Sequence, residues 1–450
     1  MAGDLAFSGV AGQTGGSMAC NYRNVSLLGC GVLALMVAAP SVSLAGGFAV
    51  REQSSYGQGA SYAGIAAGGS LSSMFWNPAT MTQVPGLQSE IVAATVFPYS
   101  VNSPHTGSTL LALGGTGNVG DTTLVPSGYT SWQINNSLWL GVSLNAPFGL
   151  SEHFPDAWAG RNYADGASLR TYNATPSIAY RINDWISVGF GVQIEYAHAS
   201  LSTGLPTGLG NVLNVTGNGW GYGVTAGVTV KPTPVTTIGL GWRSAINQKI
   251  DGSMALPAGA IFNPPFSTPG GVNTTIDLPD VVSLGLRQKI NPQLTLLGTV
   301  EWSNWSRIGT SNVNQSNGSP ATVLAGLGGG AVTLPFQYRD GWFFSVGAEY
   351  QWNEQLTLRG GVGFERSPVS DQVRTPIVPD NDRTWLSVGL SYQLTKAAAI
   401  DFAYSHLFVK NTSVNISATS GNPWFDGVTY IGGVDSHIDI VSLALKYRWK

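Results

Sequence analysis

Apolar residues alternate with small or polar residues along several segments of this 450-residue chain. Near the C-terminus, Val441, Leu443 and Leu445 share one face of an extended strand, whereas Ser442 and Ala444 share the other. A period of two residues is typical of a β-strand with two different faces. The same alternation recurs in segments 185–197, 355–365, 385–394 and 400–408. One face would contact lipid and the other a polar interior, which predicts a transmembrane β-barrel.

The composition favours membrane strands over a soluble multidomain protein. Charged residues make up only 10% of the chain, whereas soluble domains contain roughly 25%. Outside the N-terminus the sequence has no run of about 18 apolar residues, which excludes transmembrane helices there. The net charge of −3 carries little information, and the sequence has no basic cluster that would suggest a nucleic-acid partner.

The first 45 residues have the features of a secretory signal peptide. Arg23 precedes an apolar segment at 25–39, and residues 43–45 place small side chains where signal peptidase reads them. We therefore expect cleavage after Ala45, with Met18 as a possible true start. Both cysteines of the chain lie in this segment, so the mature protein is expected to have neither a disulfide nor a cysteine metal site.

Short turns and long connections divide residues 87–450 into fourteen expected strands, the first at about 87–101 and the last at about 434–449. Turn-forming residues occupy the short segments 134–136, 182–184, 231–234, 290–292, 352–354 and 395–397. The long polar stretches are 102–120, 150–168, 201–218, 253–275, 309–335, 367–382 and 411–433. Short turns at one end and long loops at the other are typical of bacterial outer-membrane barrels. We therefore expect an all-β fold, an antiparallel barrel closed without a free edge.

Residues 46–86, between the expected signal peptide and the first strand, show no sustained alternation and are rich in Gly, Ala and Ser. A barrel of this size encloses a lumen wider than its own side chains can fill. From the residues alone, two interpretations remain open for this segment. It either fills the lumen as a plug or forms a tail in the periplasm.

Two motifs in this segment are informative: Gly-Phe-Ala-Val-Arg-Glu-Gln-Ser at 47–54 and Phe-Trp-Asn-Pro-Ala-Thr-Met-Thr at 75–82. Together with segments 158–163, 175–180, 241–244, 302–306 and 379–383, in order along the chain, they resemble the FadL family of outer-membrane long-chain fatty-acid transporters. The resemblance implies a fourteen-stranded barrel plugged by an N-terminal hatch. It also implies ligand capture among extracellular loops, transfer to a lumen pocket, and lateral release beside a kinked third strand.

The third strand contains a residue that interrupts β-pairing. Pro147 cannot donate a ladder hydrogen bond, and the nearby Gly149 weakens the strand further. A local break is therefore expected, although Pro147 could merely end the strand at a loop. The resemblance implies that Asn77 and Pro78 of the hatch lie beside this break. We assign a lateral gate to these four residues and Asn145.

The expected ligand-binding residues include an apolar loop and one hatch aromatic. Loop 253–275 is unusually apolar for an exposed connection, so Met254, Phe262 and Phe266 are expected to form a capture surface. The alternative is that this loop packs on its neighbours. By resemblance, Phe48 reaches from the hatch toward the lumen pocket.

A carboxylate ligand needs a cation or polar donors in the pocket. Extending the alternation places Arg243, Arg287, Arg307 and Arg359 on the lumen side, together with Glu195, Glu301, Glu349 and Glu365. Lumen charges of both signs often pair with each other. Arg307, with Trp305 on the same face, is the preferred anion anchor, and Arg243 is a second candidate. The basic position that the resemblance implies near the end of strand five is His198 here, on the lipid-facing side.

We therefore expect a monomeric outer-membrane transporter for long-chain fatty acids, in contact with membrane lipid and without a cofactor or metal. Import of aromatic or other uncharged hydrophobic compounds is the alternative within the transport class. A lipolytic enzyme is a remote alternative, because the five histidines are scattered and no Gly-x-Ser-x-Gly motif occurs in the sequence. A general diffusion porin would leave residues 46–86 without a role.

Overall fold

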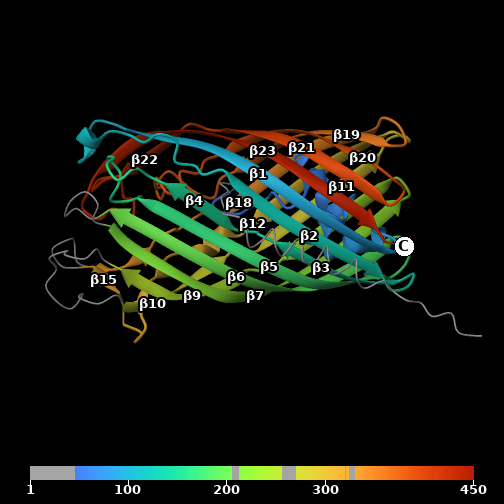
Figure 1. Cartoon of the computed structure of the whole chain (residues 1–450), viewed down its shortest axis with the longest axis horizontal. Coiled ribbons are helices and arrows are strands. Elements are labelled where there is room, and N and C mark those ends of the chain that lie inside the picture. Colours follow the sequence, from blue (N-terminus) through green and yellow to red (C-terminus); the bar gives the residue numbers. More distant parts are fainter. Residues whose placement is uncertain (1–45, 205–211, 256–269, 320, 324–329, 450) are drawn as a thin grey trace, which may run out of the picture.

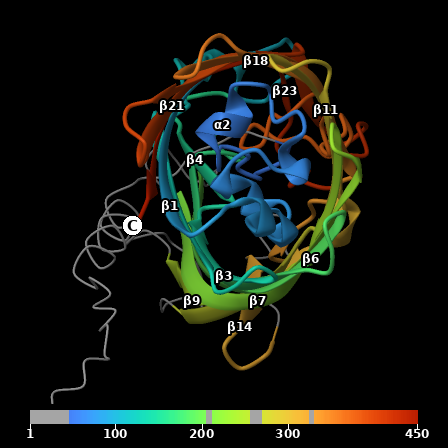
Figure 2. The ribbon, with the colours of Figure 1, turned by 90° about the vertical axis from the view of Figure 1, so that its right-hand side faces the viewer.

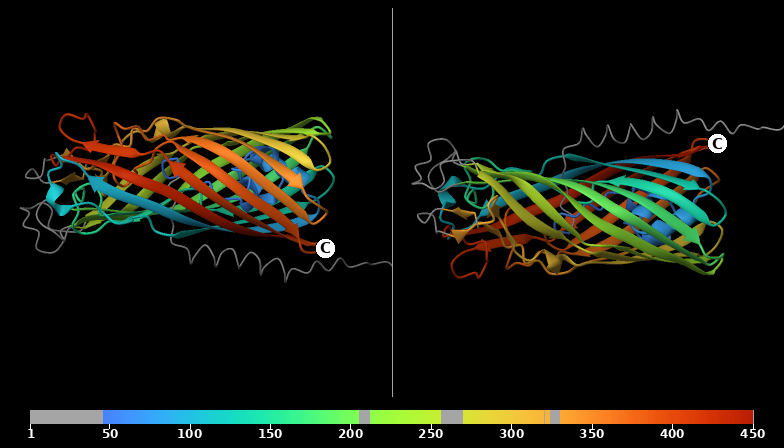
Figure 3. Two further views of the ribbon diagram at one scale, coloured as in Figure 1. Left: turned by 90° about the horizontal axis from the view of Figure 1, so that it is seen from above. Right: turned by 90° about the horizontal axis from the view of Figure 1, so that it is seen from below.

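The computed structural model describes residues 46–204, 212–255, 270–319, 321–323 and 330–449. They form a closed barrel whose long strands run obliquely around a common axis (Figures 1 and 3). The first strand, β1 (Leu87–Pro104), pairs antiparallel with the last strand, β23 (Tyr430–Arg448), along almost its whole length. This pairing closes the ring, so the first and last strands leave no free edge where they meet.

Fourteen strands span the wall of the described barrel, as the alternation predicts, and four of them consist of two segments. The other uninterrupted strands are β2 (Thr123–Gln133), β5 (Gly166–Arg181), β6 (Ile186–Gly204), β7 (Val212–Thr233), β12 (Leu294–Ser303), β18 (Gly341–Gln351), β19 (Leu356–Arg366) and β20 (Arg383–Gln393). The segmented strands are β3 (Leu138–Asn145) with β4 (Gly149–His153), β8 (Thr236–Arg243) with β9 (Ile246–Ala255), β10 (Gly270–Leu278) with β11 (Val281–Lys289), and β21 (Ala398–Val409) with β22 (Thr412–Ile416). The long connections carry η4 (Leu111–Leu113), η5 (Trp305–Ile308), β13 (Ser311–Asn312), β14 (Asn314–Gln315), β15 (Thr322–Val323), β16 (Gly330–Ala331) and β17 (Thr333–Leu334).

The two faces of the wall have the chemistry that the alternation predicts. In β6, Val188 and Phe190 are exposed on the outer surface, whereas Ser187, Gln193 and Glu195 are buried in the interior. At the C-terminal strand, Leu443 is exposed and its neighbours Ser442 and Ala444 are buried. Because lipid solvates apolar side chains, an outer surface of this kind suits a membrane barrel.

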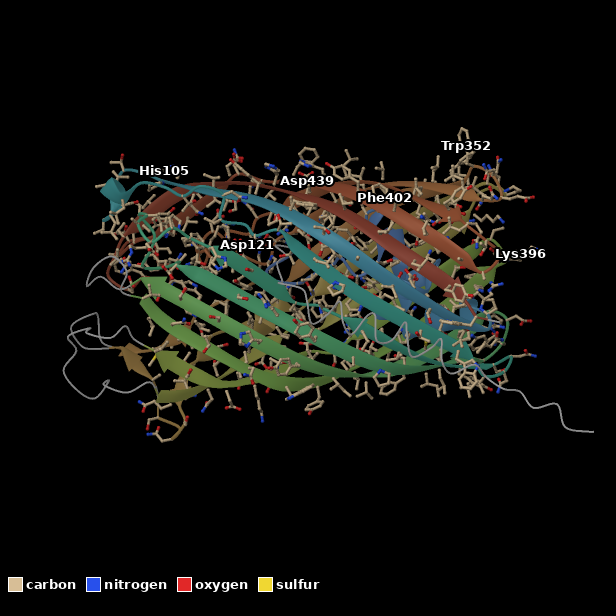
Figure 4. All side chains as sticks on the ribbon, viewed as in Figure 1. His105, Asp121, Trp352, Lys396, Phe402 and Asp439 are labelled. Carbon is tan, nitrogen blue, oxygen red and sulfur yellow. The ribbon has the colours of Figure 1, made fainter. Side chains whose placement is uncertain are left out.

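The two ends of the barrel differ in the length of their connections. The six predicted short turns join consecutive strands at one end, where Trp352 and Lys396 lie, and His105 lies at the opposite end (Figure 4). The loops expected at 201–218 and 253–275 are shorter than predicted. β6 and β7 stay paired as far as Gly204 and Val212, and β9 extends to Ala255.

The hatch, residues 46–86, lies inside the barrel (Figure 2). It contains the short helices α2 (Ser55–Gln58), η1 (Ile65–Ala67), η2 (Leu71–Phe75) and η3 (Pro78–Gln83), and nearly all of its residues are buried. The hatch backbone touches the wall where the strands carry glycine. A Cβ atom on Gly239 would lie 1.9 Å from the carbonyl oxygen of Ala66, so only glycine permits this approach. This arrangement agrees with the plug interpretation. None of the helices among the described residues is long and apolar enough to cross a membrane.

Candidate ligand-binding site

A cavity of 720 Å³ lies in the half of the barrel that faces the long loops. Its wall comes from the loop-side parts of β5, β6, β7, β9 and β10 and from segments 332–338, 373–378 and 423–428. This volume is within the range of about 300–1,000 Å³ that is typical of small-molecule sites. The volume of the cavity is therefore sufficient for a small-molecule ligand.

The cavity wall is mainly apolar. Leu150, Leu169, Leu201, Leu213, Val215 and Ile250 are among its lining residues. Asp426 is the one charged residue among the described lining residues, and it accepts a hydrogen bond of 2.7 Å from the Tyr163 hydroxyl. The described lining has no Lys, Arg or His side chain. A ligand in this cavity would meet apolar carbon together with neutral hydroxyl and amide groups.

Phe48 of the hatch contributes to the cavity wall. Its ring packs edge-on against Trp305 at 4.7 Å between centroids and lies 6.4 Å from the Phe148 ring. Trp305 is buried behind Phe48 and does not itself line the cavity. Phe48 therefore contacts both the cavity and the third strand, which carries Phe148 and contributes Leu150 to the same lining.

The third strand is broken where the sequence predicts. β3 ends at Asn145 and β4 begins at Gly149, with Pro147 between them. β2 pairs with β3 only from Gly128 onward, so the loop-side part of β2 has β1 as its sole ladder partner among the described strands. Since β4 pairs mainly with β5, the hydrogen-bonded wall is interrupted between β2 and β4.

The hatch makes two backbone hydrogen bonds with the chain at this break. The amide of Val50 donates to the Pro147 carbonyl at 2.8 Å, and the amide of Gly149 donates to the Phe48 carbonyl at 2.9 Å. Ala49 and Phe148 form an antiparallel bridge between these two bonds. Residues 48–50 thus act as a short strand paired with the broken part of the wall.

The Gln53 side chain spans the same break. Its Nε2 donates to the Ala146 carbonyl at 2.8 Å, and its Oε1 accepts from the Ser127 hydroxyl of β2 at 2.7 Å and from Asn145 Nδ2 at 3.1 Å. The Tyr129 hydroxyl donates to the Gln53 carbonyl at 2.6 Å. One hatch residue therefore links β2 to β3 where the strands no longer pair with each other.

Asn77 and Pro78 do not lie beside the break, and that part of the gate prediction is wrong in position. Asn77 caps η3 and donates through Nδ2 to the Val228 carbonyl of β7 at 3.0 Å. Pro78 lies against Gly189 of β6. The motif at 75–82 therefore docks the hatch on a different part of the wall, while residues 48–53 contact the break.

Arg307 is not in the lumen. β12 ends at Ser303, so the alternation that placed Arg307 inside no longer applies in η5. Its side chain is 48% exposed and pairs with Asp280 at 3.4 Å. It does not line the cavity, and the prediction of an anion anchor at Arg307 is corrected.

The other predicted lumen cations are inside the barrel, but they contact the hatch rather than the cavity. Arg243 is buried, donates to the Phe75 carbonyl at 3.1 Å and contacts Gln193. Arg287 and Arg359 both pair with Glu349, at 3.1 and 2.9 Å. Most lumen charges therefore have a structural role.

The predicted capture loop is described only in part. Met254 is half-buried in β9 beside Val272 and Val313, two residues of the cavity wall, but is not itself in the lining. Phe262 and Phe266 lie outside the described residues. His198 is on the outer side of β6, as predicted from its parity.

The sequence did not reveal which loops form the cavity or which residues cover the break. Gln53 lies within the Arg-Glu-Gln-Ser part of the first motif. This polar run stands out in a segment of small residues, and it was the one sequence feature that could have pointed to Gln53. Tyr129 and segments 332–338 and 423–428 carry no comparable signal, because their contacts join residues far apart in the chain.

Comparisons with known proteins agree with this geometry. The family described as "Outer membrane protein transport protein (OMPP1/FadL/TodX)" matches residues 36–449. The long-chain fatty acid transport proteins of Salmonella typhi and Escherichia coli K12 are 27% and 26% identical, over 85% of this chain and 93% of each relative. A Pseudomonas aeruginosa FadL homologue superposes with a TM-score of 0.78 at 23% identity, covering 90% of this chain and 100% of that structure. The Ralstonia pickettii toluene transporter TbuX has a TM-score of 0.62 at 21% identity, covering 85% and 94%.

Proposed function

Because this chain belongs to the outer membrane transport protein family (OMPP1/FadL/TodX), we propose that it takes up long-chain fatty acids through the outer membrane. The observation that carries this proposal is the apolar cavity of 720 Å³ beside a break in the barrel wall. Relatives named as long-chain fatty acid transport proteins support the choice of ligand.

The energetics of a long acyl chain favour such a cavity over an open channel. Exposing each methylene to water costs about 0.8 kcal/mol. Exposing a whole chain of roughly sixteen carbons would therefore cost about 12 kcal/mol of free energy. A continuous apolar wall removes most of that surface from water. Transport of this kind needs binding and release, and a water-filled pore would provide neither.

A second candidate ligand is an uncharged aromatic hydrocarbon. The observation in its favour is the absence of a basic side chain from the described cavity lining. A carboxylate in the cavity would rely on neutral donors, whereas a hydrocarbon needs none. The related fold of a toluene transporter agrees with this alternative.

Binding of oleate and toluene to the purified protein in detergent distinguishes the two ligands. Leu201→Ala should weaken binding of the true ligand by about tenfold, since the lost apolar contact is worth roughly 1–2 kcal/mol. Leu443→Ala removes the same side chain from the lipid-facing surface and is the matched control. Failure of both ligands to bind, or equal losses in the two variants, would contradict the assignment of the cavity.

We propose that the ligand leaves the barrel through the broken third strand. Phe48 lines the cavity, and its carbonyl accepts a hydrogen bond from Gly149 at the break, which supports this route. Replacing Ala146 with Val and Pro147 with Thr should restore strand pairing, and so lower uptake while leaving binding unchanged. Pro176→Thr, in the outer face of β5, is the control. Normal uptake by a correctly folded double variant would exclude this route.

A further inference from the structure

The first residues of the hatch lie among buried carboxylates. The amide of Gly47 donates to Asp380 Oδ2 at 2.8 Å. A Cβ atom on Gly46 would lie 2.7 Å from Glu365 Oε1. The nitrogen of Gly46 is bonded to the same Cα as that Cβ position, so it lies within about 5 Å of the Glu365 carboxylate. Gly46 and Gly47 are themselves buried.

The buried charges around Gly46 do not sum to zero. The cluster contains three carboxylates, Glu301, Glu365 and Asp380, and two guanidinium groups, Arg51 and Arg383. Arg51 lies 2.7 Å from Glu301 and 3.5 Å from Glu365, and Arg383 lies 3.7 Å from Glu365 and contacts Asp380. A buried charge without a partner is strongly unfavourable. Ser283, Trp385 and Ser367 donate hydrogen bonds to Glu301, Glu365 and Asp380, respectively. These donors are neutral, so one further cation would balance the charge of the cluster.

The groups that surround the cluster do not supply this cation. The nearby Glu52 is an acid, and burial raises its pKa to about 7. Tyr62 is a neutral phenol whose pKa burial raises. Arg374 donates to the backbone carbonyl of Asp380, but its charge is paired with Asp371.

We propose that the mature chain begins at Gly46 and that its α-ammonium group is the third cation of this buried cluster, paired with Glu365 beside Asp380. Ser43 and Ala45 provide the small residues that signal peptidase requires immediately before Gly46. Gly47 has a positive φ angle of 76°, which favours glycine at the second position of this mature chain.

This pairing would couple processing to the docking of the hatch. While the signal peptide is attached, the nitrogen of Gly46 is an uncharged amide, and cleavage converts it into an ammonium group. Phe48 follows two residues later in the cavity wall, next to the broken strand. The ion pair would therefore fix the end of the hatch that contributes to the binding site.

The test is to titrate the α-amino group in the folded protein. Competitive acylation at a series of pH values, followed by mass spectrometry of the N-terminal peptide, gives both its identity and its pKa. We expect a peptide that starts at Gly46 and a pKa above the ordinary 7.7–8.0. Because burial alone lowers the pKa of an amine, a raised value requires a nearby carboxylate.

Two variants distinguish the ion pair from general effects of burial. Glu365→Gln should lower the pKa of the α-amino group by about one unit and speed its acylation near pH 8 by about tenfold. Glu195→Gln removes another buried carboxylate, which contacts Asn173 rather than the hatch, and should leave the α-amino pKa unchanged. Insertion of two glycines after Ala45 should also restore an ordinary pKa, without altering the barrel. The proposal is overturned by a mature chain that starts elsewhere, or by an ordinary pKa that Glu365→Gln does not change.

Discussion

The two halves of the barrel interior use opposite chemistry. The half that contains the hatch is filled with buried ion pairs and hydrogen bonds, such as the contacts of Glu349 with Arg287, Arg359 and Tyr56. The loop-side half contains a largely apolar cavity with Asp426 as the one charge of its described lining. Buried charges are stable only when their partners are fixed, whereas apolar walls accept ligands of different shape. The buried charges therefore hold the hatch in place, whereas the apolar half is suited to bind a ligand.

Deletion of residues 46–80 should have the largest effect on this comparison. The wall strands bond to each other around the ring, so the barrel should still fold. The polar hatch-side lumen would then fill with water, and ion conductance in planar bilayers should rise by roughly tenfold or more, as expected for an unplugged barrel. Heat-modifiable gel mobility verifies folding. Unchanged conductance in a folded variant would show that the hatch does not block the lumen.

Removing a shared carboxylate should strongly destabilise the hatch-side half. Glu349→Ala leaves Arg287 and Arg359 without their common partner, and breaking a buried pair costs roughly 3–5 kcal/mol. Urea unfolding of the refolded protein in detergent measures the change. Oleate affinity of the fraction that remains folded should stay close to that of the wild type. A loss below about 1 kcal/mol, the range of exposed pairs, would contradict a structural role.

Docking of the hatch should weaken as the pH rises through about 7. Burial raises the pKa of Glu52 to about 7 from its ordinary 4.5, so the folded state favours the protonated carboxyl. The resulting stabilisation is fully present below pH 4.5 and is lost as the pH rises through 7. Hydrogen exchange of the hatch peptides at pH 5 and pH 8, corrected for intrinsic rates, measures this effect. Glu52→Gln should remove the pH dependence, and a pH dependence that persists in this variant would refute the role of Glu52.

Replacement of Arg307 should have the smallest effect. Its side chain is half exposed and pairs with Asp280, so Arg307→Ala should cost at most about 1 kcal/mol of stability. Affinity for oleate should change less than twofold, because the side chain lies outside the cavity lining. The free energy of unfolding and the affinity for oleate are measured for the wild type and for Arg307→Ala. A selective tenfold loss of oleate binding would return Arg307 to the ligand site.

The sequence predicts the barrel well because the rule involved is local. Residues two positions apart face the same side of any strand, so the faces of Phe190, Gln193 and Leu443 follow from their neighbours alone. Pro147 predicts the break in the third strand for a similarly local reason, since it has no amide hydrogen to donate. The same rule fails at Arg307, because β12 ends four residues earlier, at Ser303. Arg307 lies in the helical turn η5, where side chains no longer alternate between two faces.

The tertiary structure alone decided which residues meet across the lumen. Gly47 binds Asp380 across 333 positions, and Gln53 reaches Ser127 and Asn145 from a segment with no regular period. Such contacts depend on how the hatch folds inside the ring, which the alternation of the strands does not specify. Local periodicity therefore determined the wall and its two faces, whereas packing between distant segments determined the apolar cavity, the covered break and the buried charge cluster.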